Sequence, residues 1–349
     1  MENRPSAIPR APEKPVPVRI PSLDGLRAIA ISMVLASHQG IVTSMPISPR
    51  LRGQIGRLGP SGVRVFFVLS GFLITSILLA ELRKTNAISL RRFYLRRALR
   101  IAPAYLAFLI CLAVLCAHDY LVIEKPSPRD FVRCLFYVSN YLPVVWPLSH
   151  TWSLSVEEQF YILWPAALAF LKPRKLILVS VICISPLFRY AALFGATIFS
   201  DVQFESVADA LAVGCLFAVY REPITCSLLR WIPAACHRWV LPTAGLIIVL
   251  IDATANHPRI LAPLGLSLMN LVIGCAILFA IECPPGWLNI PVLAGLGRIS
   301  YSLYLWQQPL YEDVRLRYSW LIIALVCACL SYKLIEQPIL SWRDRKRWQ

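Results

Sequence analysis

The stretch LDGLRAIAISMVLASHQG, residues 23–40, decides the fold class of this chain. Apolar residues dominate the stretch, yet it also carries Arg27 and His38. A transmembrane helix needs about 20 predominantly apolar residues, whereas the apolar core of a signal peptide would not carry Arg and His. The stretch therefore predicts a membrane-spanning helix over residues 24–45, with polar side chains at membrane depth.

Nine further apolar runs of similar character follow this first one. They cover residues 61–82, 101–121, 155–171, 175–195, 205–220, 239–256, 260–282, 290–311 and 319–340. None alternates with a period of two, so helices are expected rather than a barrel. The run 131–148 is apolar but contains Asn140, Pro143 and Pro147, which favours an interfacial or re-entrant segment. The sequence thus predicts an all-α, polytopic membrane protein with about ten transmembrane helices.

The composition supports a membrane protein. Of 349 residues, 57% are hydrophobic and only 15% are charged, and the mean hydropathy is +0.62. Soluble domains are about 45–50% apolar and about 25% charged. An ordinary soluble enzyme is therefore excluded, and so is a disordered chain, which requires low hydrophobicity.

The formal net charge of +16 follows from membrane topology. With the N-terminus inside, the cytoplasmic segments hold more than twice as many Lys and Arg as the outer loops, as the positive-inside rule requires. Both termini are then expected to be cytoplasmic, and no nucleic-acid partner is needed to explain the charge. We expect a flexible cytoplasmic arm over residues 1–22, a membrane domain over residues 23–340 and a basic cytoplasmic tail over residues 341–349.

Neither a metal ion nor a bound cofactor is expected. The chain has 11 Cys, most of them within apolar runs, where they behave as small hydrophobic residues. It contains no CxxC pair and no HExxH motif, the spacings that indicate zinc ligands.

Arg27 and His38 are the first candidates for chemistry. On a helix, eleven residues correspond to three full turns plus about 20°, so both side chains share one face about 16 Å apart. His38 is the one His well inside a predicted span, since the other four lie in loops or at span ends, and His is well suited to act as a base near neutral pH. The alternative is that Arg27 reaches the headgroups and His38 makes a buried hydrogen bond. His150, which precedes TWSLSVEEQF, is a second candidate.

An arginine cluster lies in the cytoplasmic segment SLRRFYLRRALRIAPAY, residues 89–105. Its candidate ligands for a polyphosphate are Arg92, Arg96, Arg97 and Arg100. A guanidinium group binds phosphate with two parallel hydrogen bonds, which suits such a ligand. The alternative is an anchor on anionic lipid.

Further polar residues occur in or next to the spans. Ser70 precedes Gly71, and this small pair permits close helix packing; a catalytic serine is less favoured because no GxSxG motif is present. Glu157 lies shortly after Trp152, where an acidic residue also serves as an ordinary helix cap. Asp209 and Glu336 are further buried acids.

These segments together resemble the acyltransferase-3 family of integral membrane O-acyltransferases. The resemblance covers about residues 23–338. It is carried in order by SLDGLRAIAISMVLASH, GVRVFFVLSGFLI, FYLRRALRIAPAY, TWSLSVEEQFYILWP, DALAVGCLFA, GRISYSLYLWQQPL and SYKLIEQP. Each motif alone is weak, but seven in this order are specific.

The resemblance implies an activity and a site. The family moves an acyl group, usually acetyl, from a cytoplasmic thioester such as acetyl-CoA to a carbohydrate hydroxyl. It implies that Arg27 and His38 are the essential pair. Glu157 is a matching motif position, and we expect it to belong to the catalytic set. Arg92, Arg96, Arg97 and Arg100 are then the expected donor-binding residues. Supporting residues are expected at Ser70, Trp152, Tyr161 and Asp209.

The chain departs from the family pattern at two positions. Gln307 stands where many members have His, and Val207 stands where many have Arg shortly before the aspartate of the sixth span. We therefore expect no catalytic role for the ninth span and no such arginine partner for Asp209. Some members carry an extracytoplasmic esterase-like domain, and we expect the membrane domain here to act without one.

The donor and the acceptor are expected to enter from opposite faces of the membrane. The donor phosphates would bind at the cytoplasmic arginines, and His38 would take the proton of the acceptor hydroxyl; an acyl-histidine intermediate is the competing route. The outer loop 118–154 carries Trp146 and Trp152, which suit stacking on sugar rings, so the acceptor is expected from the outer face of a bacterial cytoplasmic (inner) membrane. Alternatives are a macrolide or signalling oligosaccharide acceptor, a proton-coupled transporter, and an acyl sensor.

Overall fold

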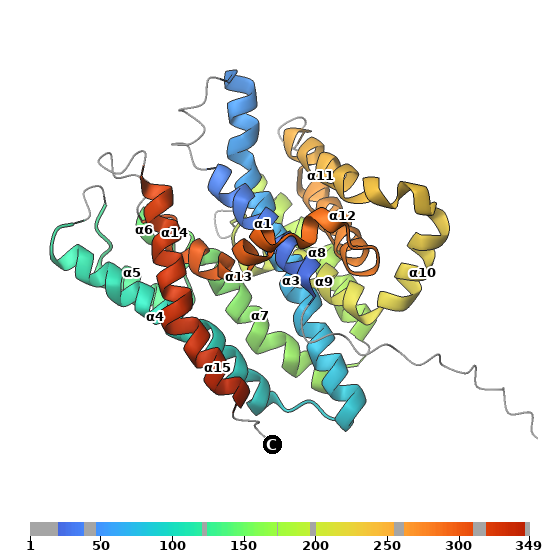
Figure 1. Cartoon of the computed structure of the whole chain (residues 1–349), viewed down its shortest axis with the longest axis horizontal. Helices are drawn as coiled ribbons and strands as arrows, with labels where there is room; N and C mark the ends of the chain where they lie inside the picture. The colour runs from blue at the N-terminus through green and yellow to red at the C-terminus, as the bar shows by residue number, and fades with distance from the viewer. Residues whose placement is uncertain are drawn as a thin grey trace, which may run out of the picture.

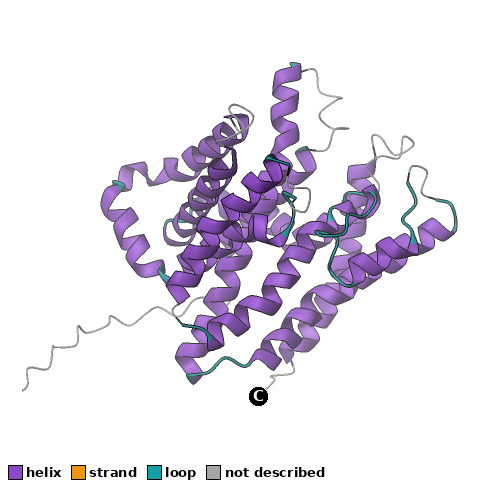
Figure 2. Cartoon of the chain, turned by 180° about the vertical axis from the view of Figure 1, so that it is seen from behind, coloured by secondary structure: helices purple, strands orange, loops and turns teal. Residues whose placement is uncertain are grey.

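The computed structural model describes residues 20–37, 47–120, 124–172, 174–195, 200–254, 262–309 and 319–345. Within these ranges the chain forms helices and connecting loops, with no strand (Figure 2). This confirms the predicted all-α fold class.

Each of the ten predicted apolar runs overlaps at least one helix (Figure 1), and residues 38–45 of the first run lie outside the described residues. The helices in the first half are α1 (Pro21–Ala36), α3 (Pro49–Thr85), α4 (Leu90–Ala117), α5 (Pro128–Leu135), α6 (Trp146–Ser149), α7 (Thr151–Phe170) and α8 (Arg174–Leu193). The second half has α9 (Phe204–Val219), α10 (Arg221–Trp231), α11 (His237–Thr254), α12 (Ala262–Glu282), α13 (Pro291–Trp306), α14 (Trp320–Ser331) and α15 (Gln337–Arg345). A π-helical turn, Tyr332–Glu336, joins the last two.

Several of these helices are long and apolar enough to cross a membrane. Among the described residues there are six, or up to seven if α9 and α10, which meet at 86°, form one broken span. Helices α1 and α13 have 16 residues each, which is short for a span. Helix α7 carries Glu157, Glu158 and Gln159 in its middle, which lowers its mean hydropathy. A polytopic membrane protein is thus confirmed, and the count of ten spans stays a prediction.

The segment 131–148 is interrupted, as its polar and proline residues predict. It contains the end of α5 and most of the short α6, with nonhelical chain between them. Hydrogen bonds fasten this segment to α7. Asn140 and Gln159 exchange amide hydrogen bonds of 3.1 and 2.9 Å, and the hydroxyl of Ser139 lies 2.8 Å from that of Ser155.

The α3–α9 crossing depends on glycine. A Cβ atom placed on Gly71 would lie 2.1 Å from the carbonyl oxygen of Leu211, and one on Gly214 would lie 2.1 Å from that of Val68. The two helix backbones therefore touch at these positions, which confirms the packing role predicted for the Ser70–Gly71 pair. Since Gly71 faces α9, the neighbouring Ser70 is turned toward a different helix.

The α1–α13 crossing is equally close. A Cβ atom on Gly297 would lie 1.9 Å from the carbonyl oxygen of Asp24, and one on Gly25 would lie 2.2 Å from that of Leu288. Helix α1 also packs along α3, where Ala30 is fully buried. Helix α1 is thus held between α3 and α13, which fixes the position of Arg27.

Asp209 has no arginine in the preceding turn of α9, where Val207 stands, but it has arginine partners from two other helices. Its carboxylate lies 2.9 Å from the guanidinium of Arg189 and 3.8 Å from that of Arg64, and it accepts a hydrogen bond of 2.6 Å from Ser267. Asp209 is fully buried, and Arg189 is only 3% exposed. The arginines come from α8 and α3 rather than from the preceding turn of α9, so a local motif could not reveal them.

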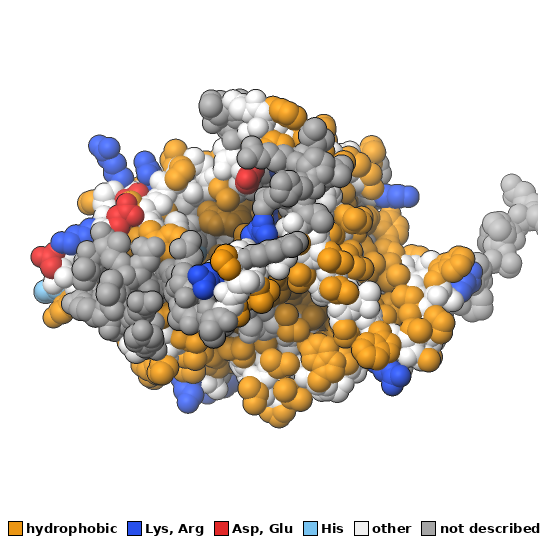
Figure 3. Space-filling model, turned by 90° about the horizontal axis from the view of Figure 1, so that it is seen from above, with side chains coloured by type: hydrophobic (Ala, Val, Ile, Leu, Met, Phe, Trp, Pro, Cys, Tyr) orange, Lys and Arg blue, Asp and Glu red, His pale blue; other side chains and the backbone are white. Residues whose placement is uncertain are grey.

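Apolar side chains cover much of the outer surface of the helices (Figure 3). Ile110 on α4, Phe170 on α7 and Val292 on α13 are 64%, 76% and 77% exposed. Such a surface suits contact with lipid hydrocarbon, whereas the polar groups described above lie between helices, in the interior of the bundle.

Candidate functional site

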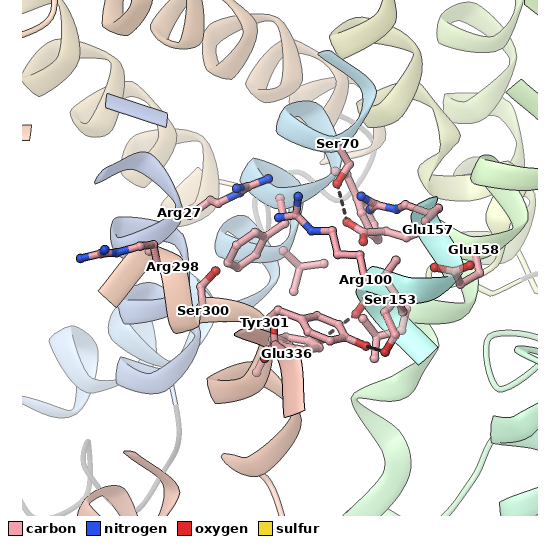
Figure 4. Close-up of a pocket in the computed structure, with 18 residues that line it drawn as sticks. Arg27, Ser70, Arg100, Ser153, Glu157, Glu158, Arg298, Ser300, Tyr301 and Glu336 are labelled. Carbon is pink, nitrogen blue, oxygen red and sulfur yellow. Dashed lines mark hydrogen bonds between the residues drawn. The ribbon is translucent and has the colours of Figure 1, made fainter. Parts of the chain in front are cut away.

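Helices α1, α3, α4, α7 and α13 and the π-helical turn enclose a polar cavity (Figure 4). About 850 Å³ of space lies between its lining atoms, part of it open to the surface. Its charged lining residues are Arg27, Arg97, Arg100, Arg298, Glu157, Glu158 and Glu336.

Two of the arginines come from adjacent turns of α4. Arg97 and Arg100 are three residues apart, so they project from the same face of the helix. Arg27 faces them from α1 and forms an ion pair with Asp24 at 3.7 Å. Figure 4 shows the guanidinium groups of Arg27 and Arg100 on the same side of the cavity as Ser70 and Glu157. This side of the cavity therefore offers several positive charges to an anionic ligand.

Glu157 is held at the cavity wall by two hydroxyl groups. The Ser70 hydroxyl on α3 donates a hydrogen bond of 2.8 Å to Oε1 of Glu157. The Tyr161 hydroxyl, one helical turn after Glu157, lies 3.0 Å from Oε2 and 3.1 Å from the Ser70 oxygen. Hydrogen bonds donated to a carboxylate fix its orientation.

The ring of Tyr161 also contacts an arginine. The guanidinium carbon of Arg97 lies 3.8 Å from the ring centre, within the range of a cation–π interaction. Tyr161 is only 1% exposed. It lies behind the cavity wall and touches both a basic and an acidic lining residue.

The opposite side of the cavity is built from hydroxyl groups and an acid. Ser153 and Tyr304 are hydrogen-bonded to each other at 2.6 Å, and Tyr304 also donates to the backbone oxygen of His150 at 3.1 Å. Glu336 lies at the end of the π-helical turn and accepts a hydrogen bond from Ser302. Short π-helical segments occur frequently at functional sites.

The structure gathers most of the predicted site residues and separates others. Arg27, Ser70, Arg97, Arg100 and Glu157 line the cavity, and Tyr161 lies directly behind it. His38 falls outside the described residues, so its proposed role stays a prediction.

Four predicted residues do not line the cavity. Arg92 and Arg96 lie on α4, but neither is among the residues that line the cavity. Trp152 packs edge-on against Phe67, with ring centres 6.0 Å apart. Asp209 belongs to the separate charge cluster with Arg64 and Arg189. The site roles of all four stay predictions.

Sequence reasoning did not select several lining residues as site residues. Glu158, Arg298, Ser153 and Tyr304 line the cavity, as does Glu336, which the sequence indicates only as a buried acid. The motifs GRISYSLYLWQQPL and SYKLIEQP contain three of them, but motif membership does not show which face of a helix meets α4 and α7. Gln307, at the end of α13, is 1% exposed and is not among the cavity residues.

A polytopic helical membrane protein with an arginine-rich interior cavity is the class that the fold and site define. The family model described as an acyltransferase domain matches residues 20–336. The chain therefore belongs to the acyltransferase-3 family.

Curated relatives of this chain are named as O-acetyltransferases. The O-acetyltransferase OatA of Staphylococcus aureus is 30% identical over 367 aligned positions, covering 93% of this chain and 57% of that protein. The peptidoglycan O-acetyltransferase OatA of Listeria monocytogenes is 30% identical over 362 positions, covering 92% of this chain and 56% of that protein. The chain thus spans somewhat more than half the length of these relatives. No solved structure matches it.

Proposed function

We propose that this chain transfers an acetyl group from acetyl-CoA to a hydroxyl group of a cell-surface polysaccharide at a bacterial cytoplasmic membrane. Family membership supports acyl transfer, and the names of the relatives support O-acetylation and a glycan acceptor. The observation that carries the proposal is one cavity in which Arg97 and Arg100 lie on the same wall as a hydrogen-bonded glutamate, Glu157.

The arginines suit the donor. Coenzyme A carries several phosphate charges, and guanidinium groups bind phosphate oxygens with two parallel hydrogen bonds. Arg97 and Arg100 lie about 10 and 15 Å along α4 from its first residue. In the predicted orientation this first residue is at the cytoplasmic surface, so a donor entering from that side meets these arginines early.

The transfer step needs a base and a group that stabilises negative charge. In the proposed reaction His38 takes the proton of the acceptor hydroxyl, whose oxygen attacks the thioester carbonyl carbon. A carbon–oxygen bond forms, the carbon–sulfur bond breaks, and the CoA thiolate leaves and is protonated. Negative charge that develops on the carbonyl oxygen needs a hydrogen-bond donor close to His38. Arg27 is expected about 16 Å from His38 along the helix, so Arg27, with Glu157 in the same cavity, would hold and orient the acyl donor.

Transfer by the purified full-length protein tests this function. The protein in lipid nanodiscs is given isotope-labelled acetyl-CoA and soluble glycan fragments, and acetylated glycan is measured by mass spectrometry. His38→Ala and Glu157→Gln should lower transfer by at least about a hundredfold while the protein still inserts and folds. Normal glycan acetylation by His38→Ala would contradict the mechanism.

Donor binding needs a charge-matched control. Arg97→Ala with Arg100→Ala should weaken acetyl-CoA binding, measured by calorimetry, by at least about tenfold. The control, Lys84→Ala with Arg91→Ala, removes the same charge from exposed positions outside the cavity. Equal donor affinity in both double variants would show that the cluster only anchors the chain to lipid.

Sealed vesicles of known orientation test the sidedness. Acetyl-CoA is enclosed on the cytoplasmic side, and glycan is supplied on the other. We expect transfer in this arrangement. Transfer only when both substrates share the cytoplasmic side would reject the two-sided route and leave the acyltransferase assignment intact.

A further inference from the structure

Tyr161 occupies an unusual position relative to the cavity. It follows Glu157 by one helical turn on α7, is 1% exposed, and lies behind the wall rather than in it. A buried tyrosine of this kind would ordinarily fill space and satisfy its hydroxyl group once. Here its ring and its hydroxyl each contact a different charged residue of the cavity.

The hydroxyl contacts are directed at the acid. The Tyr161 oxygen lies 3.0 Å from Oε2 of Glu157, while Ser70 donates to Oε1 at 2.8 Å. Each carboxylate oxygen of Glu157 thus has its own hydroxyl neighbour, one from α3 and one from α7. The carboxylate plane is therefore fixed from two directions.

The ring of Tyr161 contacts the basic residue, Arg97. The Arg97 guanidinium lies over the Tyr161 ring at 3.8 Å. Arginine has a long, flexible side chain, so a ring in this place restricts where its charge lies. The contact joins α4 to α7 at the level of Glu157.

We propose that Tyr161 is a positioning residue that fixes the charge of Arg97 relative to the carboxylate of Glu157. The inference rests on the proposed function, in which Arg97 binds donor phosphate and Glu157 orients the acyl donor. The hydroxyl then governs the rate of transfer, and the ring governs the affinity for the donor. One side chain thus holds both residues in place for the acyl donor.

Two substitutions separate the two effects. Tyr161→Phe keeps the ring and removes the hydroxyl; it should lower the single-turnover transfer rate about tenfold or more, with donor affinity within about twofold of the original protein. Tyr161→Leu removes both groups and should in addition weaken donor binding about fivefold or more. Donor affinity is measured by calorimetry with a thioether analogue of acetyl-CoA, on full-length protein in nanodiscs.

Tyr94 offers the matched control. Its hydroxyl donates a hydrogen bond of 2.9 Å to the backbone oxygen of Ile162, so it joins the same two helices outside the cavity lining. Tyr94→Phe should change neither the rate nor the affinity by more than about twofold. Ser70→Ala should follow Tyr161→Phe, with a lower rate and an unchanged affinity.

The outcomes distinguish this inference from the function on which it rests. If the original protein binds the analogue and transfers acetyl groups, but Tyr161→Phe and Ser70→Ala match Tyr94→Phe, the positioning role is wrong. If Tyr161→Leu does not fold, the comparison of Tyr161→Phe with Ser70→Ala decides the question. If the original protein does not bind the analogue, the proposed donor is wrong, and this assignment is overturned with it.

Discussion

Substitution of Asp209 tests whether its charge cluster stabilises the fold or takes part in the site. Its carboxylate is fully buried, forms ion pairs with Arg189 at 2.9 Å and Arg64 at 3.8 Å, and accepts a hydrogen bond of 2.6 Å from Ser267. Asp209→Asn keeps the shape and removes the charge, which leaves two buried guanidinium groups without their counter-ion. Breaking a buried ion pair in this way costs about 3–5 kcal/mol, because neither arginine can reach water.

The assay measures thermal unfolding and donor binding on the same preparations. Asp209→Asn should lower the melting midpoint by an amount on the order of 10 °C and leave donor affinity below that midpoint unchanged. Asp119→Asn, whose side chain is 76% exposed and paired only with the exposed Lys125, is the control and should melt with the original protein. If Asp209→Asn melts normally but loses donor binding or transfer, the charge cluster belongs to the site, and our reasoning from the structure is refuted.

Two further substitutions test the packing of the fold. Gly71→Ala should destabilise the chain by about 1–3 kcal/mol, since the added methyl group meets the backbone of α9. Gly245→Ala is the control and should not destabilise the chain, because a Cβ atom there would have no neighbour within 4 Å. Coincident melting curves for the two variants would contradict this prediction. Asn140→Leu removes both amide hydrogen bonds to Gln159 and should cost about 1–3 kcal/mol. It should also raise hydrogen exchange in the segment that precedes α7, and unchanged exchange there would show that the amide pair does not hold the segment.

The helices were predictable because membrane insertion depends on local sequence. Each span must be apolar over about 20 residues and must satisfy its own backbone hydrogen bonds, so the run lengths indicate each helix without knowledge of its neighbours. The interruption at Asn140, Pro143 and Pro147 was visible for the same reason. The partners of each polar residue depend on which helices touch, and sequence spacing does not contain that information.

The arginine cluster illustrates this limit. Arg92 and Arg96 carry the same charge in the same segment as Arg97 and Arg100, and charge alone predicts a donor role for all four. Only the packing of α4 on α7, α13 and the π-helical turn separates them, because the cavity that it forms is lined by Arg97 and Arg100 and not by Arg92 or Arg96. The partners of Asp209 were hidden for a related reason, since Arg189 lies twenty residues earlier, on the preceding helix.

Helix α3 shows how one element serves both the fold and the site. Residues 63, 66, 67 and 70 recur at helical spacing and line the cavity. Residues 61, 64, 68 and 71 recur in the same way on another face, where they meet Asp252, Asp209 and the glycine crossing with α9. Ser70 and Gly71 are adjacent in sequence and therefore about 100° apart around the helix. The close approach at Gly71 thus determines where Ser70 points, and the motif SG joins a packing requirement to the orientation of Glu157.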